Sequence, residues 1–206
     1  MKKILIYGDS NVWGDNFYTN KRIDDCKQWP IILEKNLKNE YKIIQEGLPG
    51  RLAGDEEKTK KYKNGKDTFI AVLKTQSPID IIIIMLGTND LQTKYNKSED
   101  KTIKDLLWYK ETIEEDFKND ETKIKYYNNK LPNILYILPP NFNAKEVFDD
   151  NAEKKRQSII NYFEKNNINH IKINNMPLFE DNIHLNYEGH EILANLVERK
   201  ITNDNK

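Results

Sequence analysis

Short apolar runs alternate with amphipathic stretches along the whole chain. Five of these runs predict strands, over residues 4–7, 41–45, 79–86, 133–138 and 170–173. The third run, IDIIIIMLG, leaves no position polar for contact with water. It therefore predicts a central strand that is covered on both faces, as in a parallel sheet.

The segments between the predicted strands place apolar residues at the spacing of helices. The apolar faces comprise Trp29, Ile32, Leu33 and Leu37; Phe69, Ile70 and Leu73; Ile103, Leu106, Leu107, Ile113 and Phe117; Ile159, Ile160 and Phe163; and Ile192, Leu193, Leu196 and Val197. Ser98 is a suitable N-cap for the third of these helices. Two stretches rich in lysine and asparagine, 52–65 and 118–130, lack a sustained periodicity and are interpreted as excursions from the core.

This alternation of strands and helices predicts an α/β fold with a doubly wound parallel sheet. We expect a flavodoxin-like three-layer sandwich with a five-stranded parallel sheet, formed by a single domain over residues 1–206. A chain of 206 residues suits one domain of ordinary size with a substantial core.

The charge balance, the cysteine content and the length of the apolar runs limit which binding partners and which cellular location are expected. The 33 basic and 33 acidic residues cancel, and no basic stripe stands out, so a nucleic-acid partner is not expected. The single cysteine, Cys26, excludes an intrachain disulfide framework and fits a reducing compartment. No apolar run is long enough to span a bilayer, and the N-terminus lacks the pattern of a signal peptide. We expect a cytoplasmic protein without a membrane partner; an export signal outside the present sequence is left open.

Small and polar residues follow the carboxyl ends of the predicted strands. Gly8-Asp9-Ser10 follows the first strand, EGLPGR (46–51) the second and GTND (87–90) the third, while EDNIHLNYEGH (180–190) lies beyond the fifth. Ligands bind at this edge in open parallel sheets. Serine, glycine, asparagine and an aspartate–histidine pair are thus predicted to converge there.

These residue types are those of acyl transfer. The Ser10 hydroxyl needs a base within hydrogen-bond reach, and His184 is the candidate, with Asp181 to orient its imidazole. The tetrahedral oxyanion needs fixed donors, which the main-chain N–H groups of Ser10 and Gly50 and the side-chain amide of Asn89 would supply. Gly50 suits this position because its backbone, without a Cβ, can approach the substrate closely.

Four segments, GDSNVWG, EGLPGR, IIIIMLGTND and DNIHLNYEGH, resemble the four sequence blocks of the SGNH (GDSL-like) hydrolase superfamily in order and spacing. Within it, GDS followed by WG, EGL-x-x-R and MLGTND are similar to the arylesterase and acyltransferase branch. The resemblance implies a flavodoxin-like fold, no metal or cofactor, and the catalytic set Ser10, Gly50, Asn89, Asp181 and His184. The chain departs from the pattern at Asn11, where leucine is commonest, and at Asn182, where glycine is frequent.

Several of these residues also have a purely structural interpretation. Ser10 alone would more often be a helix cap than a nucleophile. Asn89 and Asp90 could both be turn residues, and Asp9 is expected to pin its turn by accepting hydrogen bonds from main-chain N–H groups.

Of the other histidines, His170 is expected at the surface and His190 in a packed helix face. A metal site from Asp181, His184 and His190 is a disfavoured alternative, because no cysteine or carboxylate cluster completes it.

The expected substrate contacts are less specific. Trp13 is interpreted as half core and half wall of the acyl pocket. Arg51 is a candidate to bind a substrate carboxylate, with pairing to Glu46 as the alternative. Cys26 is expected to be inert. The aromatic residues Trp108, Tyr109, Tyr126 and Tyr127 could form a subunit contact of a homo-oligomer or a pocket rim, and packing within the domain is the preferred interpretation.

We therefore expect a serine esterase that acts on small-molecule acyl esters, such as acetyl esters, through an acyl-enzyme. Aryl, carbohydrate, lysophospholipid and thioester substrates all remain open. The alternative from another class is a flavodoxin-like binding protein that holds a phosphate or another anion at the GDSNVWG turn. A scaffold that has lost activity is a third alternative, and the complete set of five residues argues against it.

Overall fold

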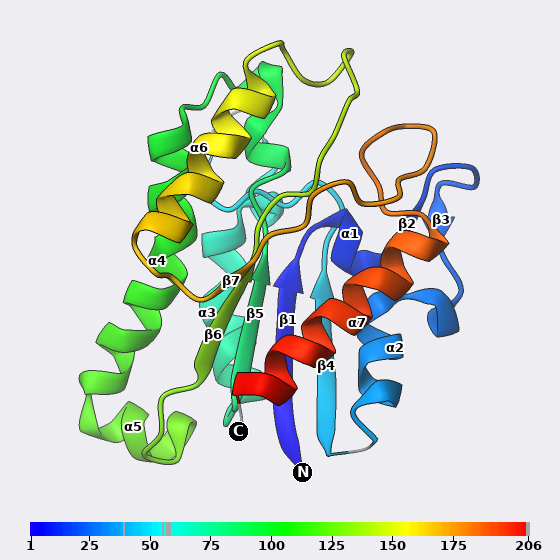
Figure 1. The fold of residues 1–206 in the computed structure, drawn as a ribbon. Helices are drawn as coiled ribbons and strands as arrows, with labels where there is room; N and C mark the ends of the chain where they lie inside the picture. The colour runs from blue at the N-terminus through cyan, green and yellow to red at the C-terminus, as the bar shows by residue number, and fades with distance from the viewer. Residues whose placement is uncertain (39, 55, 57–58, 205–206) are drawn as a thin grey trace.

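The computed structural model describes residues 1–38, 40–54, 56 and 59–204. Its centre is a parallel sheet of five strands: β1 (Lys2–Gly8), β4 (Tyr41–Gly47), β5 (Ile81–Met85), β6 (Asn133–Ile137) and β7 (His170–Ile171). The strands lie in the order β4-β1-β5-β6-β7, and all four neighbouring pairs are parallel. This is the predicted flavodoxin-like order, with the strands close to their predicted positions (Figure 1).

Helices cover both faces of the sheet. Helices α2 (Trp29–Asn36) and α7 (Tyr187–Asp204) pack on one face, and α3 (Gly65–Gln76), α4 (Glu99–Lys118) and α6 (Ala152–Lys165) pack on the other. Alternate residues of β1 serve the two cores: Ile4 and Ile6 face α2 and α7, whereas Leu5 and Tyr7 face α3, α4 and α6. The two-sided burial explains why β5 has no polar position.

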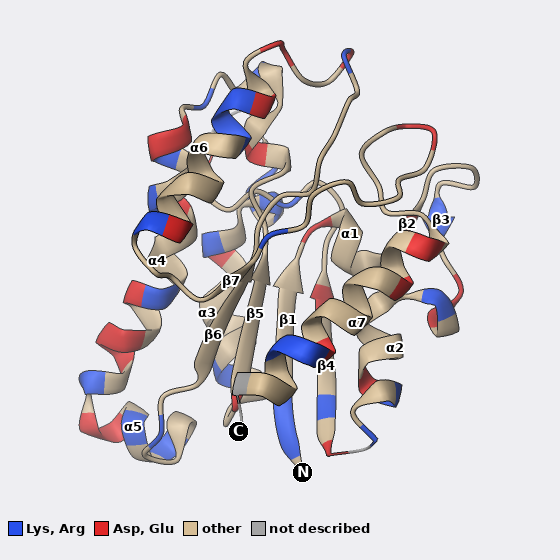
Figure 2. Ribbon diagram, in the orientation of Figure 1, with Lys and Arg blue, Asp and Glu red and all other residues tan. Residues whose placement is uncertain are grey.

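The largest helix, α4, begins where its sequence predicts. The Ser98 side chain accepts a hydrogen bond from the main-chain N–H of Lys101, which satisfies one of the free donors of the first turn. On this helix Tyr109 is fully buried and donates its hydroxyl to the main-chain oxygen of Ala53 at 2.7 Å. Tyr109 therefore packs within the domain, as preferred above. Acidic and basic residues are interspersed along the outward surfaces of α4 and α6 (Figure 2).

The second polar stretch was expected to be irregular, and it contains a helix instead. Helix α5 (Asp120–Tyr127) begins at Asn119, whose side chain accepts from the main-chain N–H groups of Glu121 and Thr122. It ends at Asn128, which adopts the left-handed conformation with φ +50°. Tyr127 is its only buried residue, so the apolar periodicity that usually reveals a helix is nearly absent. The residues that cap its two ends, rather than an apolar face, define this helix.

The first polar stretch returns directly to the core, as expected. The main-chain N–H of Leu52 donates to the Lys63 carbonyl, and the N–H of Gly65 donates to the Leu52 carbonyl. These two hydrogen bonds close the polar stretch just before α3. Residues 55, 57 and 58 of this stretch lie outside the described residues. Of the helices that the structure describes, none combines the length and apolar character needed to cross a membrane.

Candidate active site

Ser10 lies at the carboxyl end of β1, where the chain turns into the short helix α1 (Ser10–Trp13). The carboxyl ends of β1, β4 and β5 point towards this part of the molecule (Figure 1). Asp9 caps the helix, and its Oδ1 accepts from the Asn11 N–H at 3.0 Å. Asp9 thus pins the turn as expected. Burial raises the pKa of Asp9 to about 6, against the lowering effects of the Asn11 N–H and of His184.

A continuous chain of hydrogen bonds joins Ser10, His184 and Asp181. The Ser10 Oγ lies 2.9 Å from His184 Nε2, and His184 Nδ1 lies 2.5 Å from Asp181 Oδ2. The short D-x-x-H spacing works because Asn182 adopts the left-handed conformation, with φ +55°. Asp181 Oδ1 also accepts from the main-chain N–H groups of Ile183 and His184 at 3.0 and 3.1 Å.

The aspartate and the histidine shift each other's protonation. Burial lowers the pKa of His184, but the hydrogen bond and charge of Asp181 raise it by more, so the pKa lies above its ordinary value. Burial raises the pKa of Asp181, and the His184 hydrogen bond and two main-chain N–H groups lower it by more. Asp181 is therefore the ionised partner at neutral pH, and an imidazolium at His184 is stabilised.

Asn89 begins the short helix η3 (Asn89–Leu91) after β5. Its side chain contacts the turn after β1 and the turn after β4. Its Nδ2 donates to the main-chain oxygen of Arg51 at 3.1 Å and lies 3.5 Å from Asp9 Oδ2. Its Oδ1 accepts from Gln92 Nε2 at 2.7 Å. The two sides of the amide thus have partners of opposite character, which fixes its orientation.

Gly50 lies in the turn that follows β4. Its φ of +75° is one that glycine adopts without strain, and a Cβ at this position would lie 2.7 Å from Lys63 Nζ. The main-chain N–H groups of Gly50 and Ser10 donate to no other residue in the part of the chain that the structure describes.

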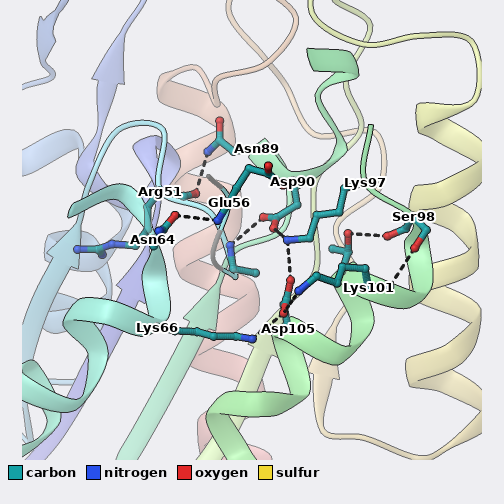
Figure 3. A network of polar contacts seen from close by, with 12 residues as sticks. Arg51, Glu56, Asn64, Lys66, Asn89, Asp90, Lys97, Ser98, Lys101 and Asp105 are labelled. Carbon is teal, nitrogen blue, oxygen red and sulfur yellow. Dashed lines mark hydrogen bonds and ion pairs between the residues drawn. The ribbon is translucent and has the colours of Figure 1, made fainter. Parts of the chain in front are cut away.

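The adjacent Asp90 belongs to a network of buried charges beside these loops (Figure 3). Its Oδ2 accepts from the Ala53 N–H at 2.8 Å, and its Oδ1 pairs with Lys97. Lys97 also lies 2.6 Å from Asp105, which pairs with Lys66 at 2.6 Å. Asp90 therefore has a structural role beyond that of a turn residue, because it ties the loop of Gly50 to the loop of Asn89.

The position of Arg51 argues against the predicted contact with a substrate carboxylate. Its side chain is buried, and Nη1 donates to the main-chain oxygens of Gly8, at 2.9 Å, and Glu46. The guanidinium carbon lies 4.1 Å from the centre of the Tyr7 ring. Arg51 holds the ends of β1 and β4 together, through the main chain of Glu46 and not through its carboxylate. Trp13 is half-buried on α1, and its role as a pocket wall stays a prediction.

The other two histidines are engaged elsewhere. His190 is buried, its Nδ1 accepts from the Trp29 N–H at 3.3 Å, and burial lowers its pKa to about 4, so it is the expected neutral packing residue. His170 is half-buried in β7 and bonds to the Ile168 carbonyl. Among the described residues, no group of three His, Cys, Asp or Glu side chains is arranged to hold a metal ion. Cys26 is exposed.

Two side chains near the site, those of Gln92 and Asn11, have roles that the sequence alone does not indicate. Gln92 orients Asn89, and Asn11 accepts from the Leu185 N–H at 2.8 Å. Asn11 was noted only as a departure from the leucine that is commonest in the resembling family. A polar residue at a position that usually holds leucine was the available signal.

A serine, a histidine and an aspartate joined in this way at the edge of a flavodoxin-like sheet are the arrangement of a serine hydrolase. The chain matches the family model of GDSL-like lipases/acylhydrolases over residues 4–197. It belongs to this family and is a serine ester hydrolase. The resemblance read from the four sequence blocks is thereby confirmed.

Solved structures share the fold over nearly the whole chain. A carbohydrate acetylesterase family member from Sinorhizobium meliloti is 23% identical, with a TM-score of 0.81 and coverage of 98% of this chain and 97% of that one. The aryl esterase of M. smegmatis is 20% identical, with a TM-score of 0.82 and coverage of 98% and 99%. A lipase/acylhydrolase from Enterococcus faecalis is 17% identical, with a TM-score of 0.71 and coverage of 99% and 97%. No curated protein sequence matches the chain significantly.

Proposed function

We propose that the protein hydrolyses small acyl esters through an acyl-enzyme formed on Ser10. The observation that supports this most directly is the chain of hydrogen bonds from Asp181 through His184 to Ser10 Oγ. His184 Nε2 takes the hydroxyl proton as Oγ attacks the carbonyl carbon, and ionised Asp181 stabilises the resulting imidazolium. His184 then gives the proton to the departing alcohol. Water repeats these steps on the acyl-enzyme, which releases the acid and restores Ser10.

The oxyanion that forms in each step would be held by the main-chain N–H groups of Ser10 and Gly50 and by the Asn89 amide. One hydrogen of Asn89 Nδ2 is engaged by the Arg51 carbonyl at 3.1 Å. The contact of Nδ2 with Asp9 Oδ2 is long, at 3.5 Å, so the second hydrogen remains available to a stronger acceptor without any rotation of the amide. A developing negative charge is such an acceptor.

Ser10→Ala tests the nucleophile. The variant should fold normally and lose hydrolysis of p-nitrophenyl acetate by about 10³-fold or more, because the activated hydroxyl is gone. A fluorophosphonate probe should label the wild-type protein at Ser10 alone. Activity retained in the alanine variant, or labelling at another residue, would remove Ser10 from the mechanism. The alternative of an anion-binding protein without activity predicts no labelling at all.

The acyl pocket is proposed to be short. Trp13 lies three residues after Ser10 on the same short helix, and Pro49 stiffens the turn before Gly50. Each added methylene of a long acyl chain would have to find space against this wall. We expect acetate and propionate esters to be cleaved faster than octanoate esters. Trp13→Ala should shift the preference towards longer chains, and a wild-type preference for octanoate would contradict the proposal.

A cavity of about 500 Å³ beside Asp181 is the proposed place of the alcohol. It is lined by Phe17, residues 143–147 and residues 180–183, which combine an aromatic ring and aliphatic side chains with polar and charged groups. Such a lining suits a ring-shaped alcohol with hydroxyl groups, either aryl or carbohydrate. Assays of phenyl acetate against acetylated monosaccharides, in the wild type and in Phe17→Ala, would distinguish these two alcohols.

A further inference from the structure

Asn11 connects the segment that carries Ser10 to the segment that carries His184. It follows Ser10 directly in α1, and its side chain is buried, with an exposed fraction of 2%. Its Oδ1 accepts from the Leu185 N–H at 2.8 Å, and its Nδ2 lies 3.5 Å from the Ile183 carbonyl oxygen. One side chain thus contacts the main chain on both sides of His184.

The main chain of Asn11 is itself fixed from two directions. Its N–H donates to Asp9 Oδ1 at 3.0 Å, and its carbonyl accepts from Trp29 Nε1 at 3.1 Å. The side chain therefore extends from a rigid point next to the nucleophile. The segment that it reaches is held on the opposite side by the Phe179 N–H, which donates to the His184 carbonyl at 2.8 Å.

We infer that Asn11 is a positioning residue, which sets the distance between His184 Nε2 and Ser10 Oγ through the main chain of Ile183 and Leu185. The inference rests on the proposed function, because it concerns the same serine and histidine. Leucine at this position would be of similar size but could accept no hydrogen bond, so the buried Leu185 N–H would lose its partner. The segment would then shift to satisfy that group, and small displacements of a base from its nucleophile cost much of the rate.

The test compares Asn11→Leu and Asn11→Ala with Asn186→Ala, using p-nitrophenyl acetate and active-site titration with a fluorophosphonate. Asn186 is a matched control, because its side chain bonds main-chain groups at Leu178 and Gly189 and makes no hydrogen bond to Ile183 or Leu185, the two residues that Asn11 contacts. Both Asn11 variants should lose about 10- to 100-fold in kcat per titrated site with little change in KM, and should be labelled correspondingly more slowly. Asn186→Ala should lower Tm and leave kcat nearly unchanged.

Asn11→Ala cannot clash with its neighbours, so it remains informative if the leucine variant does not fold. If both Asn11 variants have a lower Tm but a normal kcat and labelling rate, Asn11 is only structural and the inference is wrong. The inference is also wrong if Asn186→Ala and Asn11→Ala lose kcat in the same proportion to their loss in Tm. Ser10→Ala in the same assays distinguishes a failure of the proposed function from a failure of the Asn11 inference. An active Ser10→Ala overturns the proposed function. If Ser10→Ala is inactive, the Asn11 variants alone decide the inference.

Discussion

Asp181 accepts hydrogen bonds from both the imidazole and the main-chain N–H of His184. Its Oδ2 lies 2.5 Å from Nδ1, and its Oδ1 lies 3.1 Å from the N–H. The same carboxylate therefore closes the turn and orients the ring that the turn carries. This double contact explains how two residues only three positions apart can supply both a base and the group that orients it.

The pH dependence of activity should follow His184. The hydrogen bond and charge of Asp181 outweigh burial and raise the pKa of His184, and only the neutral imidazole can accept the Ser10 proton. Activity should therefore be full above this raised pKa and fall as pH drops through it, at a higher pH than for an ordinary histidine. Asp181→Asn removes the charge, so the midpoint should move to lower pH while kcat falls by about 10²- to 10⁴-fold.

The measurement is the pH profile of kcat/KM for p-nitrophenyl acetate. His170→Ala is the control, because the ring of His170, in β7, contacts the Ile168 carbonyl and the Phe163 ring, away from the triad, and its loss should leave the profile unchanged. A midpoint that stays in place in Asp181→Asn would mean that Asp181 does not set the pKa of the essential base.

Asn89→Ala should lower kcat by about 10²- to 10³-fold with a small change in KM. The ground-state carbonyl needs the amide little, whereas the tetrahedral oxyanion carries a full charge in a sheltered site. Asn89→Asp should be worse, because it sets a negative charge against the intermediate. Tm and kcat are measured on the same preparations. A destabilised but fully active Asn89→Ala would make Asn89 a turn residue only.

Gln92→Glu should inactivate the protein through Asn89. Gln92 Nε2 donates to Asn89 Oδ1 at 2.7 Å, and this directs Nδ2 to the opposite side. A carboxylate cannot donate, so the Asn89 amide should turn over and present its oxygen where the oxyanion forms. We expect a loss in kcat of about 10²-fold, close to that of Asn89→Ala.

Gln92→Met is the control for this prediction. Methionine has a similar length but favours neither orientation of the amide, so it should lose much less activity than Gln92→Glu. Equal losses in the two variants would mean that the amide orientation does not depend on the hydrogen bond from residue 92.

The strands and the principal site residues could be predicted because their signals are local. The β5 sequence shows its burial on both faces directly, Ser10 and Asn89 lie just after strands β1 and β5, and His184 lies in the polar segment between β7 and α7. Helix α5 was missed because its ends are set by Asn119 and Asn128 while its surface is almost entirely polar. Other contacts were missed because the partner is a main-chain group that is distant in the sequence and has no motif of its own.

Arg51 and Asn11 are the clearest cases. Arg51 looked like a ligand for a carboxylate, and only the fold brings the Gly8 carbonyl to it from 43 residues away. The Leu185 N–H that Asn11 binds lies 174 residues further along the chain. No spacing within the sequence indicates such pairs, because they depend on how α1 and the segment before α7 meet at the sheet edge.

The buried ion network of Asp90, Lys97 and Asp105 should contribute strongly to stability, and an exposed ion pair on α4 should not. Lys97 is nearly inaccessible, with 3% of its side chain exposed, and it joins Asp90 and Asp105, whose side chains are 0% and 1% exposed. Burial lowers the pKa of Lys97, and the two carboxylates raise it by more, so the Lys97 ammonium is charged at neutral pH. Asp90→Asn removes one partner of a buried charge and should cost about 3–5 kcal/mol of unfolding free energy.

Lys110→Ala is the matched control, because its pair with Glu114 has both side chains more than 40% exposed and should contribute less than about 1 kcal/mol. Denaturant unfolding of Asp90→Asn, Lys97→Met and the double variant completes a thermodynamic cycle. Removing both charges should cost less than the sum of the single losses, because neither is then left buried without its partner. Additive losses would show that Asp90 and Lys97 act independently. A loss for Asp90→Asn no larger than for Lys110→Ala would show that the buried network contributes no more than a surface pair.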